Sequence, residues 1–277
     1  MTERAETKPK RGLLLTGGGA KGAFQIGALK YIIGESVRDY DIVSGFSVGA
    51  LTGAMVAQGD FELLHEVWAG IQSIRDIFGG NLRFYKGFLT MKPLRKIVEK
   101  LLDAEKLRSS GKRFFYFTVD LQNGLLVERD ETSEPLTDWL LASATIPGVF
   151  QPVEIDGRQY VDGGVMATNP LSPLIREGAE EIDIITCRPV SDWKIEERVE
   201  TLVEVAIRSL ELIQAELVRV DIEKCRLINS TLEKWSGVKD NASFVDEYFL
   251  RRAERKSEFP LKEYRRVKLN IIEPPSE

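Results

Sequence analysis

The 277-residue chain contains one histidine, two cysteines and no long apolar run. Cys187 and Cys225 lie far apart and have no other metal-type ligands at paired spacing, so we expect free thiols in a reducing compartment. The start, residues 1–11, is polar and charged, and it is followed by far fewer than the about 18 apolar residues of a spanning helix. We therefore expect a cytoplasmic protein whose contact with a membrane, where it occurs, is peripheral.

An excess of positive charge is also missing, since 38 basic residues face 43 acidic ones and the net charge is −5. This balance argues against a nucleic-acid partner bound through a chain-wide positive field, because phosphates are bound by clustered lysine and arginine, and it leaves a local basic patch open. The chain is 43% hydrophobic and 29% charged, which is typical of a globular protein. No repeat or flexible linker divides it, so we expect a polar tail at 1–10 and a single domain at 11–277.

Short apolar runs alternate with helical patterns along the chain, which predicts a mostly parallel sheet covered by helices on both faces, an α/β fold. Strands are expected at 12–16, 41–44, 113–119, 125–128, 159–161, 182–187 and 266–271. Helices are expected at 20–33, 48–58, 61–78, 93–102, 136–143, 170–177 and 194–228. The helix at 170–177 has Asn169 as its expected cap and Pro170 as its first residue. The last helix has an apolar stripe of Val199, Leu202, Val203, Ala206, Leu210, Ile213 and Leu217.

Residues 61–102 form an insertion of amphipathic and aromatic-basic character. Phe84, Tyr85 and Phe88 alternate there with basic residues, which suits a lid or contact with an anionic lipid surface. The same pattern also fits a helix packed on the core with a solvated basic face. The charged region 232–262 is assigned no chemistry.

The first motif is a glycine-rich turn between a strand and a helix. It comprises Gly17, Gly18, Gly19, Lys21 and Gly22. Bare amides at a helix start form an anion cradle. A dinucleotide site is one reading, with Asp39 or Asp41 as the ribose acid, but Asp41 stands at the start of its strand rather than the end. A nucleotide-triphosphate loop does not fit, because no Ser or Thr follows Lys21.

The second motif, Gly45-Phe46-Ser47-Val48-Gly49, joins a strand to a helix. A G-x-S-x-G sequence in that setting predicts a nucleophile elbow, in which Gly45 and Gly49 leave room for a strained Ser47. The small residues after it suit close packing of the helix on the sheet.

The third motif places Asp162, Gly163 and Gly164 at the end of an apolar strand. An Asp-Gly turn is the structural reading. A nucleophilic serine, however, needs a base, and the single histidine, His65, lies on the flank of an expected surface helix. Asp162 is therefore the best-placed partner of Ser47.

These three motifs, in this order and with residues 143–148 (SATIPG) between the second and third, resemble the patatin-like phospholipases. The resemblance runs from about residue 11 to residue 187. It implies a three-layer α/β/α fold, a dyad of Ser47 and Asp162 without histidine, and an oxyanion hole from the amides of Gly17, Gly18 and Gly19. It further implies chemistry without a metal or cofactor, with Lys21 in a structural role.

The activity that the resemblance implies is a lipid acyl hydrolase of the phospholipase A or lysophospholipase type, with a phospholipid or another acyl ester as its partner. A soluble carboxylesterase or an acyltransferase would use the same dyad. From a different class, a non-catalytic protein would bind nucleotides or anions through the glycine loop, with Ser47 only starting a helix.

Overall fold

The computed structural model describes residues 8–80, 89–167, 169–196, 198–240 and 264–275. Its main sheet has eight strands in the order β10-β9-β1-β2-β5-β8-β7, with β6 also paired to β5. The strands are β1 (Arg11–Leu15), β2 (Ile42–Gly45), β5 (Arg113–Asp120), β6 (Leu125–Asp130), β7 (Val153–Ile155), β8 (Arg158–Asp162), β9 (Glu181–Ile185) and β10 (Lys268–Ile272). The five strands β10, β9, β1, β2 and β5 pair in parallel, and β6, β7 and β8 join antiparallel.

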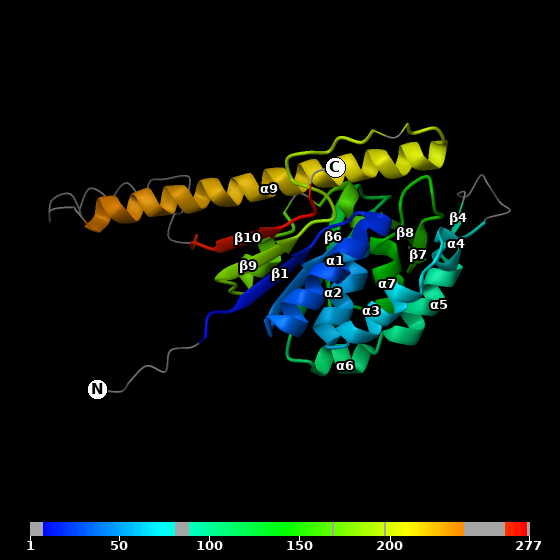
Figure 1. The fold of residues 1–277 in the computed structure, drawn as a ribbon, viewed down its shortest axis with the longest axis horizontal. Coiled ribbons are helices and arrows are strands. Elements are labelled where there is room, and N and C mark those ends of the chain that lie inside the picture. Colours follow the sequence, from blue (N-terminus) through cyan, green and yellow to red (C-terminus); the bar gives the residue numbers. More distant parts are fainter. Residues whose placement is uncertain (1–7, 81–88, 168, 197, 241–263, 276–277) are drawn as a thin grey trace.

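Helices cover both faces of this sheet (Figure 1). They are α1 (Gly22–Leu29), α2 (Val48–Gln58), α3 (Phe61–Gly70), α4 (Ile74–Ile77), α5 (Lys92–Leu101), α6 (Ala104–Ser109), α7 (Leu136–Ser143), α8 (Ser172–Arg176) and the long α9 (Leu202–Asp240). Short helical turns occur at η1 (Gly19–Lys21), η2 (Lys30–Glu35) and η4 (Gly163–Val165), and a two-stranded sheet joins β3 (Gly79–Gly80) to β4 (Leu89–Thr90).

Alternation of side chains along the strands explains the layers. On β1, Leu13 and Leu15 join the apolar cluster beneath α1, α2 and α7, whereas Leu14 points into a second cluster with Val218 and Ile222 of α9. Because successive side chains of a strand point to opposite faces, a fully apolar strand needs a cover on each side. The expected three-layer α/β/α fold with a mostly parallel sheet is confirmed.

Strand β5 offers one edge to two partners in succession. Residues 42–45 of β2 pair with residues 113–116 of β5, and residues 160–162 of β8 pair with residues 118–120. Both partners lie on the same edge, because β6 pairs with residues 115–120 and so occupies the other. The strands β2 and β8 therefore meet end to end beside Phe117.

Several expected helices have different bounds. The helix predicted at 61–78 is divided into α3 and α4, and the one predicted at 194–228 begins at Leu202 and ends at Asp240. The helix predicted at 170–177 is the shorter α8, and Asn169 does not cap it: the Asn169 Oδ1 atom instead accepts a hydrogen bond from Lys224 at 3.2 Å. The N–H of Leu171, which precedes α8, donates to Asp221 of α9 at 3.1 Å, so a tertiary contact sets this end.

Two sequence expectations fall outside the described residues. The aromatic-basic stretch of the insertion lies at residues 84–88, and most of the charged region 232–262 lies at residues 241–262. Of the second, residues 232–240 form the end of α9.

The close approach of α2 to β1 predicts that Gly49 tolerates no side chain. A Cβ atom at Gly49 would lie 2.1 Å from the carbonyl oxygen of Leu15. The contact is with backbone, so relief requires the helix or the strand to shift, and we expect Gly49→Ala to lower the free energy of unfolding by about 3 kcal/mol or more.

Gly27→Ala is the matched control, since Gly27 lies in α1 and a Cβ there would meet nothing within 4 Å. That substitution should be neutral or stabilise by up to about 1 kcal/mol. Urea unfolding of both variants tests the pair, and equal stabilities would contradict the close packing.

Candidate active site

Ser47 lies in a strained turn between β2 and α2. Its backbone has φ 56° and ψ −134°, a conformation that non-glycine residues rarely adopt. A Cβ atom at Gly45 would lie 2.3 Å from the carbonyl oxygen of Gly49, so the turn closes only with glycine there. The expected elbow geometry, with Gly45 and Gly49 making room, is present, and Ser47 stands at the start of α2.

The glycine loop links β1 to η1 and begins with the backbone N–H groups of three consecutive glycines. Among the described residues, the backbone N–H groups of Gly17, Gly18 and Gly19 donate to no other protein group. Gly18 and Gly19 have φ of 158° and 56°, and a Cβ at Gly18 would lie 2.3 Å from that of Cys187. Glycine is therefore required at Gly18 by both conformation and space.

Asp162 ends β8 and begins the turn η4. Its side chain is fully buried, and its Oδ1 atom accepts a hydrogen bond from the Gly164 N–H at 2.7 Å. A Cβ atom at Gly163 would lie 2.2 Å from the carbonyl oxygen of Phe117, which is the β5 residue between the ends of β2 and β8. The Asp-Gly-Gly sequence thus lets the chain turn tightly against β5.

The segment at residues 143–148 ties these motifs together. The N–H of Ser47 donates to the carbonyl oxygen of Ser143 at 3.1 Å and lies 3.3 Å from its hydroxyl oxygen. The N–H of Asp162 donates to the carbonyl oxygen of Thr145 at 2.9 Å. One short segment at the end of α7 therefore holds the backbones of both residues.

Burial raises the pKa of Asp162 to about 7 from an ordinary value of 3.8. The Ser47 hydroxyl and the Gly164 N–H act in the opposite direction, because both stabilise the charged form. The Oδ2 atom of Asp162 has no hydrogen-bond partner among the described residues. The carboxylate is thus held through Oδ1, and Ser47 lies close enough to influence its titration.

Two glutamines complete the site, and sequence reasoning missed both. Gln25 of α1 donates to the carbonyl oxygens of Thr16 and Ile185 at 2.8 and 3.1 Å, which fixes the start of the glycine loop on β9. Gln214 of α9 lies between the glycine loop and the acid turn, and its Nε2 atom is 3.4 Å from Oδ1 of Asp162.

The expected apolar stripe of the last helix was partly wrong. Leu202 and Ile213 are 75% and 44% exposed, and Val199 precedes the helix. The buried face instead carries Leu210, Gln214, Val218, Asp221, Ile222 and Cys225. Gln214 is four residues from both Leu210 and Val218, and this spacing was the signal that could have placed it on the buried face.

The remaining candidates lie elsewhere. Lys21 ends η1 and Gly22 packs against Val48 of α2, where a Cβ would lie 2.7 Å from a methyl group. Asp41 precedes β2 and accepts the Arg11 N–H at 2.8 Å, so it stands at the opposite end of the sheet from the glycine loop. The Nε2 atom of His65, in α3, lies 3.4 Å from the Nζ atom of Lys30.

Both cysteines are buried and free. Within the part of the chain that the structure describes, no cluster of three His, Cys, Asp or Glu side chains could hold a metal ion. No helix there combines the length and apolar character needed to span a bilayer.

The model of the patatin-like phospholipase family matches residues 13–175, which is more than half of the chain. The match includes the glycine loop, the serine elbow and the acid turn. The chain therefore belongs to the patatin-like phospholipase family.

Individual relatives agree with this assignment. An uncharacterized NTE family protein of Mycobacterium tuberculosis is 31% identical over 187 residues, which cover 64% of this chain and 49% of that protein. Lysophospholipase NTE1 of Cryptococcus neoformans is 25% identical over 190 residues, covering 65% of this chain and 11% of its own length. The chain thus spans about half of the mycobacterial relative.

Among solved structures, VipD of Legionella pneumophila matches with a TM-score of 0.49 and 14% identity, over 84% of this chain and 55% of that one.

The raised pKa of Asp162 predicts that this residue destabilises the fold at neutral pH. The folded state holds the proton more tightly than the unfolded state, so stability falls as pH rises from about 4 to about 7. Asp162→Asn cannot ionise and keeps an oxygen for the Gly164 N–H. We expect it to be more stable than the wild type at pH 8, by up to about 4 kcal/mol, and equal to it near pH 4.

Asp120→Asn is the control of opposite sign. Asp120 accepts hydrogen bonds from the N–H groups of Gln122 and Asn123 and pairs with Arg158, and its pKa is lowered despite burial. Replacement of Asp120 by Asn should therefore lower the free energy of unfolding at pH 8. Urea unfolding at both pH values tests the two variants, and an Asp162→Asn protein less stable at pH 8 would contradict the raised pKa.

Proposed function

We propose that this protein is a lipid acyl hydrolase of the phospholipase A or lysophospholipase type, with Ser47 as nucleophile and Asp162 as its base. The observation that carries the proposal is the buried Asp162 carboxylate beside a strained serine at a helix start, with an Oδ2 atom that has no hydrogen-bond partner in the described part of the chain. A serine that only began a helix would not require that strain or that buried acid.

The first step is attack of the Ser47 hydroxyl oxygen on the ester carbonyl while Asp162 takes the hydroxyl proton. The carbonyl becomes an oxyanion, and the N–H groups of Gly17, Gly18 and Gly19, which have no acceptor among the described residues, are the donors proposed to stabilise it. The proton passes to the leaving alkoxide, and the acyl group stays on Ser47. Water activated by Asp162 then cleaves this ester and releases the fatty acid.

The pKa of Asp162 makes this proton transfer feasible. The pKa of an ordinary carboxyl group lies about three units below neutral pH. This difference adds roughly 4 kcal/mol to direct transfer of the serine proton to the carboxylate. A pKa of about 7 removes most of that cost. No step of the proposed chemistry uses a metal ion or a cofactor.

A lipid ester is the proposed substrate because the chain belongs to the patatin-like phospholipases and one relative is named a lysophospholipase. Peripheral membrane contact is part of this proposal. A soluble carboxylesterase or an acyltransferase would share the first step and differ in the ester bound or the acceptor that enters.

Labelling with a fluorophosphonate tests the nucleophile. We expect wild-type protein to be labelled at Ser47 in the presence of EDTA and to release fatty acid from mixed liposomes, because Asp162 activates the serine without a metal. Ser47→Ala and Asp162→Asn should fold and lose at least about 1,000-fold of the turnover. Retained hydrolysis in either folded variant would disprove the dyad, and labelling without lipid release would favour a soluble ester.

The pH dependence tests the base. Because Asp162 must be ionised to accept the proton, kcat/KM should rise with pH to a plateau, with a midpoint near 7. Steady-state hydrolysis of a short-chain ester between pH 4 and 9 measures it. A midpoint near 4 would show that Asp162 is solvated or is not the base.

A further inference from the structure

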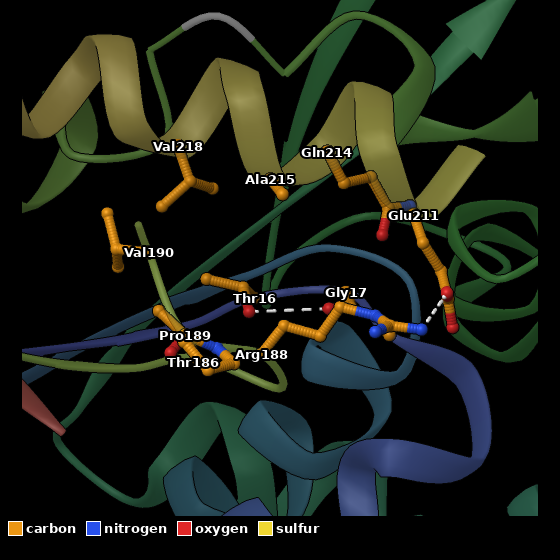
Figure 2. Close-up of a pocket in the computed structure, with 11 residues that line it drawn as sticks. Thr16, Gly17, Thr186, Arg188, Pro189, Val190, Glu211, Gln214, Ala215 and Val218 are labelled. Carbon is orange, nitrogen blue, oxygen red and sulfur yellow. Dashed lines mark hydrogen bonds and ion pairs between the residues drawn. The ribbon is translucent and has the colours of Figure 1, made fainter. Parts of the chain in front are cut away.

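The helix α9 places a glutamine side chain in the space between the two reactive loops. A Cβ atom at Gly17 would lie 2.3 Å from Oε1 of Gln214, and one at Gly164 would lie 2.1 Å from its Nε2. Figure 2 shows the helix on one side and the glycine loop on the other, with Gln214 reaching toward Gly17. The amide thus fills the gap between the oxyanion donors and the acid turn.

The dyad is closed to solvent in this arrangement. Ser47 is 4% exposed and Asp162 is 0% exposed, and Gln214 itself is 4% exposed. The cavity between α9 and the glycine loop measures about 30 Å³, room for about two water molecules. An acyl chain cannot reach Ser47 through this gap unless a part of the structure moves.

The contacts that hold α9 differ along its length. Val218, Ile222 and Cys225 pack into the apolar cluster on the sheet. The preceding turns bury one apolar side chain, Leu210, which belongs to neither apolar cluster. They are otherwise held by polar contacts: Glu211 pairs with Arg188, and Arg208 donates to the carbonyl oxygen of Trp193.

The hydrogen bonding of Gln214 is also incomplete. Its Oε1 atom is buried without a partner among the described residues, and its bond to Asp162 is long at 3.4 Å. Burial of a carbonyl oxygen without a hydrogen bond costs free energy. Exposure of Gln214 to water removes this cost and so offsets part of the free energy needed to move the helix. Farther toward the helix start, Leu202 and Val205 are 75% and 46% exposed. The first part of α9 is therefore the weakly held part.

We infer that residues 202–214 of α9 form a movable cover over the dyad, with Gln214 as its plug, and that this structure is the closed state of the enzyme. The cover moves away when an acyl substrate enters, while the apolar contacts from Val218 onward keep the rest of α9 on the sheet. This inference rests on the proposed function, because it assumes that an acyl group must reach Ser47.

The rate of Ser47 labelling by a fluorophosphonate tests the cover. Gln214→Ala should be labelled at least about fivefold faster than the wild type, because the plug is removed. Glu211→Gln should also accelerate labelling, since it breaks the pair with Arg188 without shortening the plug. Glu216→Ala is the matched control on the same helix, as Glu216 pairs with Arg219 and with no other residue that the structure describes, and it should match the wild type.

A second measurement follows the movement directly. Hydrogen exchange of residues 202–214 should accelerate after Ser47 has reacted with a long-chain alkyl phosphonate, while residues 218–225 keep their protection. Unchanged protection of residues 202–214 after complete labelling would overturn the cover. Equal or slower labelling of folded Gln214→Ala would overturn it as well, and slower labelling would make Gln214 a positioning residue for Asp162.

Failure of the proposed function would look different. In that case Ser47 would be labelled in none of the variants, and no ester would be hydrolysed. Labelling of Ser47 at the same rate in the wild type and Gln214→Ala would contradict the cover alone.

Discussion

The candidate site depends on the shared edge of β5. Two strands of opposite direction, β2 and β8, use that edge in succession, and their carboxyl ends meet beside Phe117. The serine turn and the acid turn therefore face each other although more than a hundred residues separate them. Any change that slides β2 or β8 along β5 would separate Ser47 from Asp162. Glycine at position 163 allows the acid turn to approach β5 this closely, because a Cβ atom there would lie 2.2 Å from the carbonyl oxygen of Phe117.

Close backbone packing also sets the chemistry of the site. The glycines at positions 45, 49 and 163 bring main chain against main chain at the serine and acid turns. Asp162 is fully buried in this packing. Burial then raises the pKa of Asp162 toward neutrality. The same burial makes the ionised carboxylate unfavourable for folding, so stability is lost where a usable base is gained. In the proposed mechanism the buried Asp162 carboxylate takes the role of the histidine that other serine hydrolases use as a base.

The helix α9 lies over the glycine loop (Figure 2) and carries a polar residue, Gln214, on a mostly apolar buried face. Sequence reasoning placed Ile213 and Leu217 on the buried stripe and did not include Gln214, because hydropathy gives a glutamine no reason to be buried. The residues that Gln214 approaches, Gly17 on one side and Asp162 and Gly164 on the other, come from two distant segments, and only the assembled fold brings them to one helix face. Gln25 was missed for the same reason.

The sequence by itself determined the α/β class, the positions of the main-sheet strands other than β7 to within two residues at either end, and the two turns that carry Ser47 and Asp162. These follow from local physics, since apolar alternation, glycine spacing and strand-to-helix turns are encoded by neighbouring residues. The tertiary structure alone decided how α8 begins, where α9 starts, and that residues 143–148 hold both turns. It also decided the raised pKa of Asp162, because burial is a property of the packed chain and not of any short segment of it.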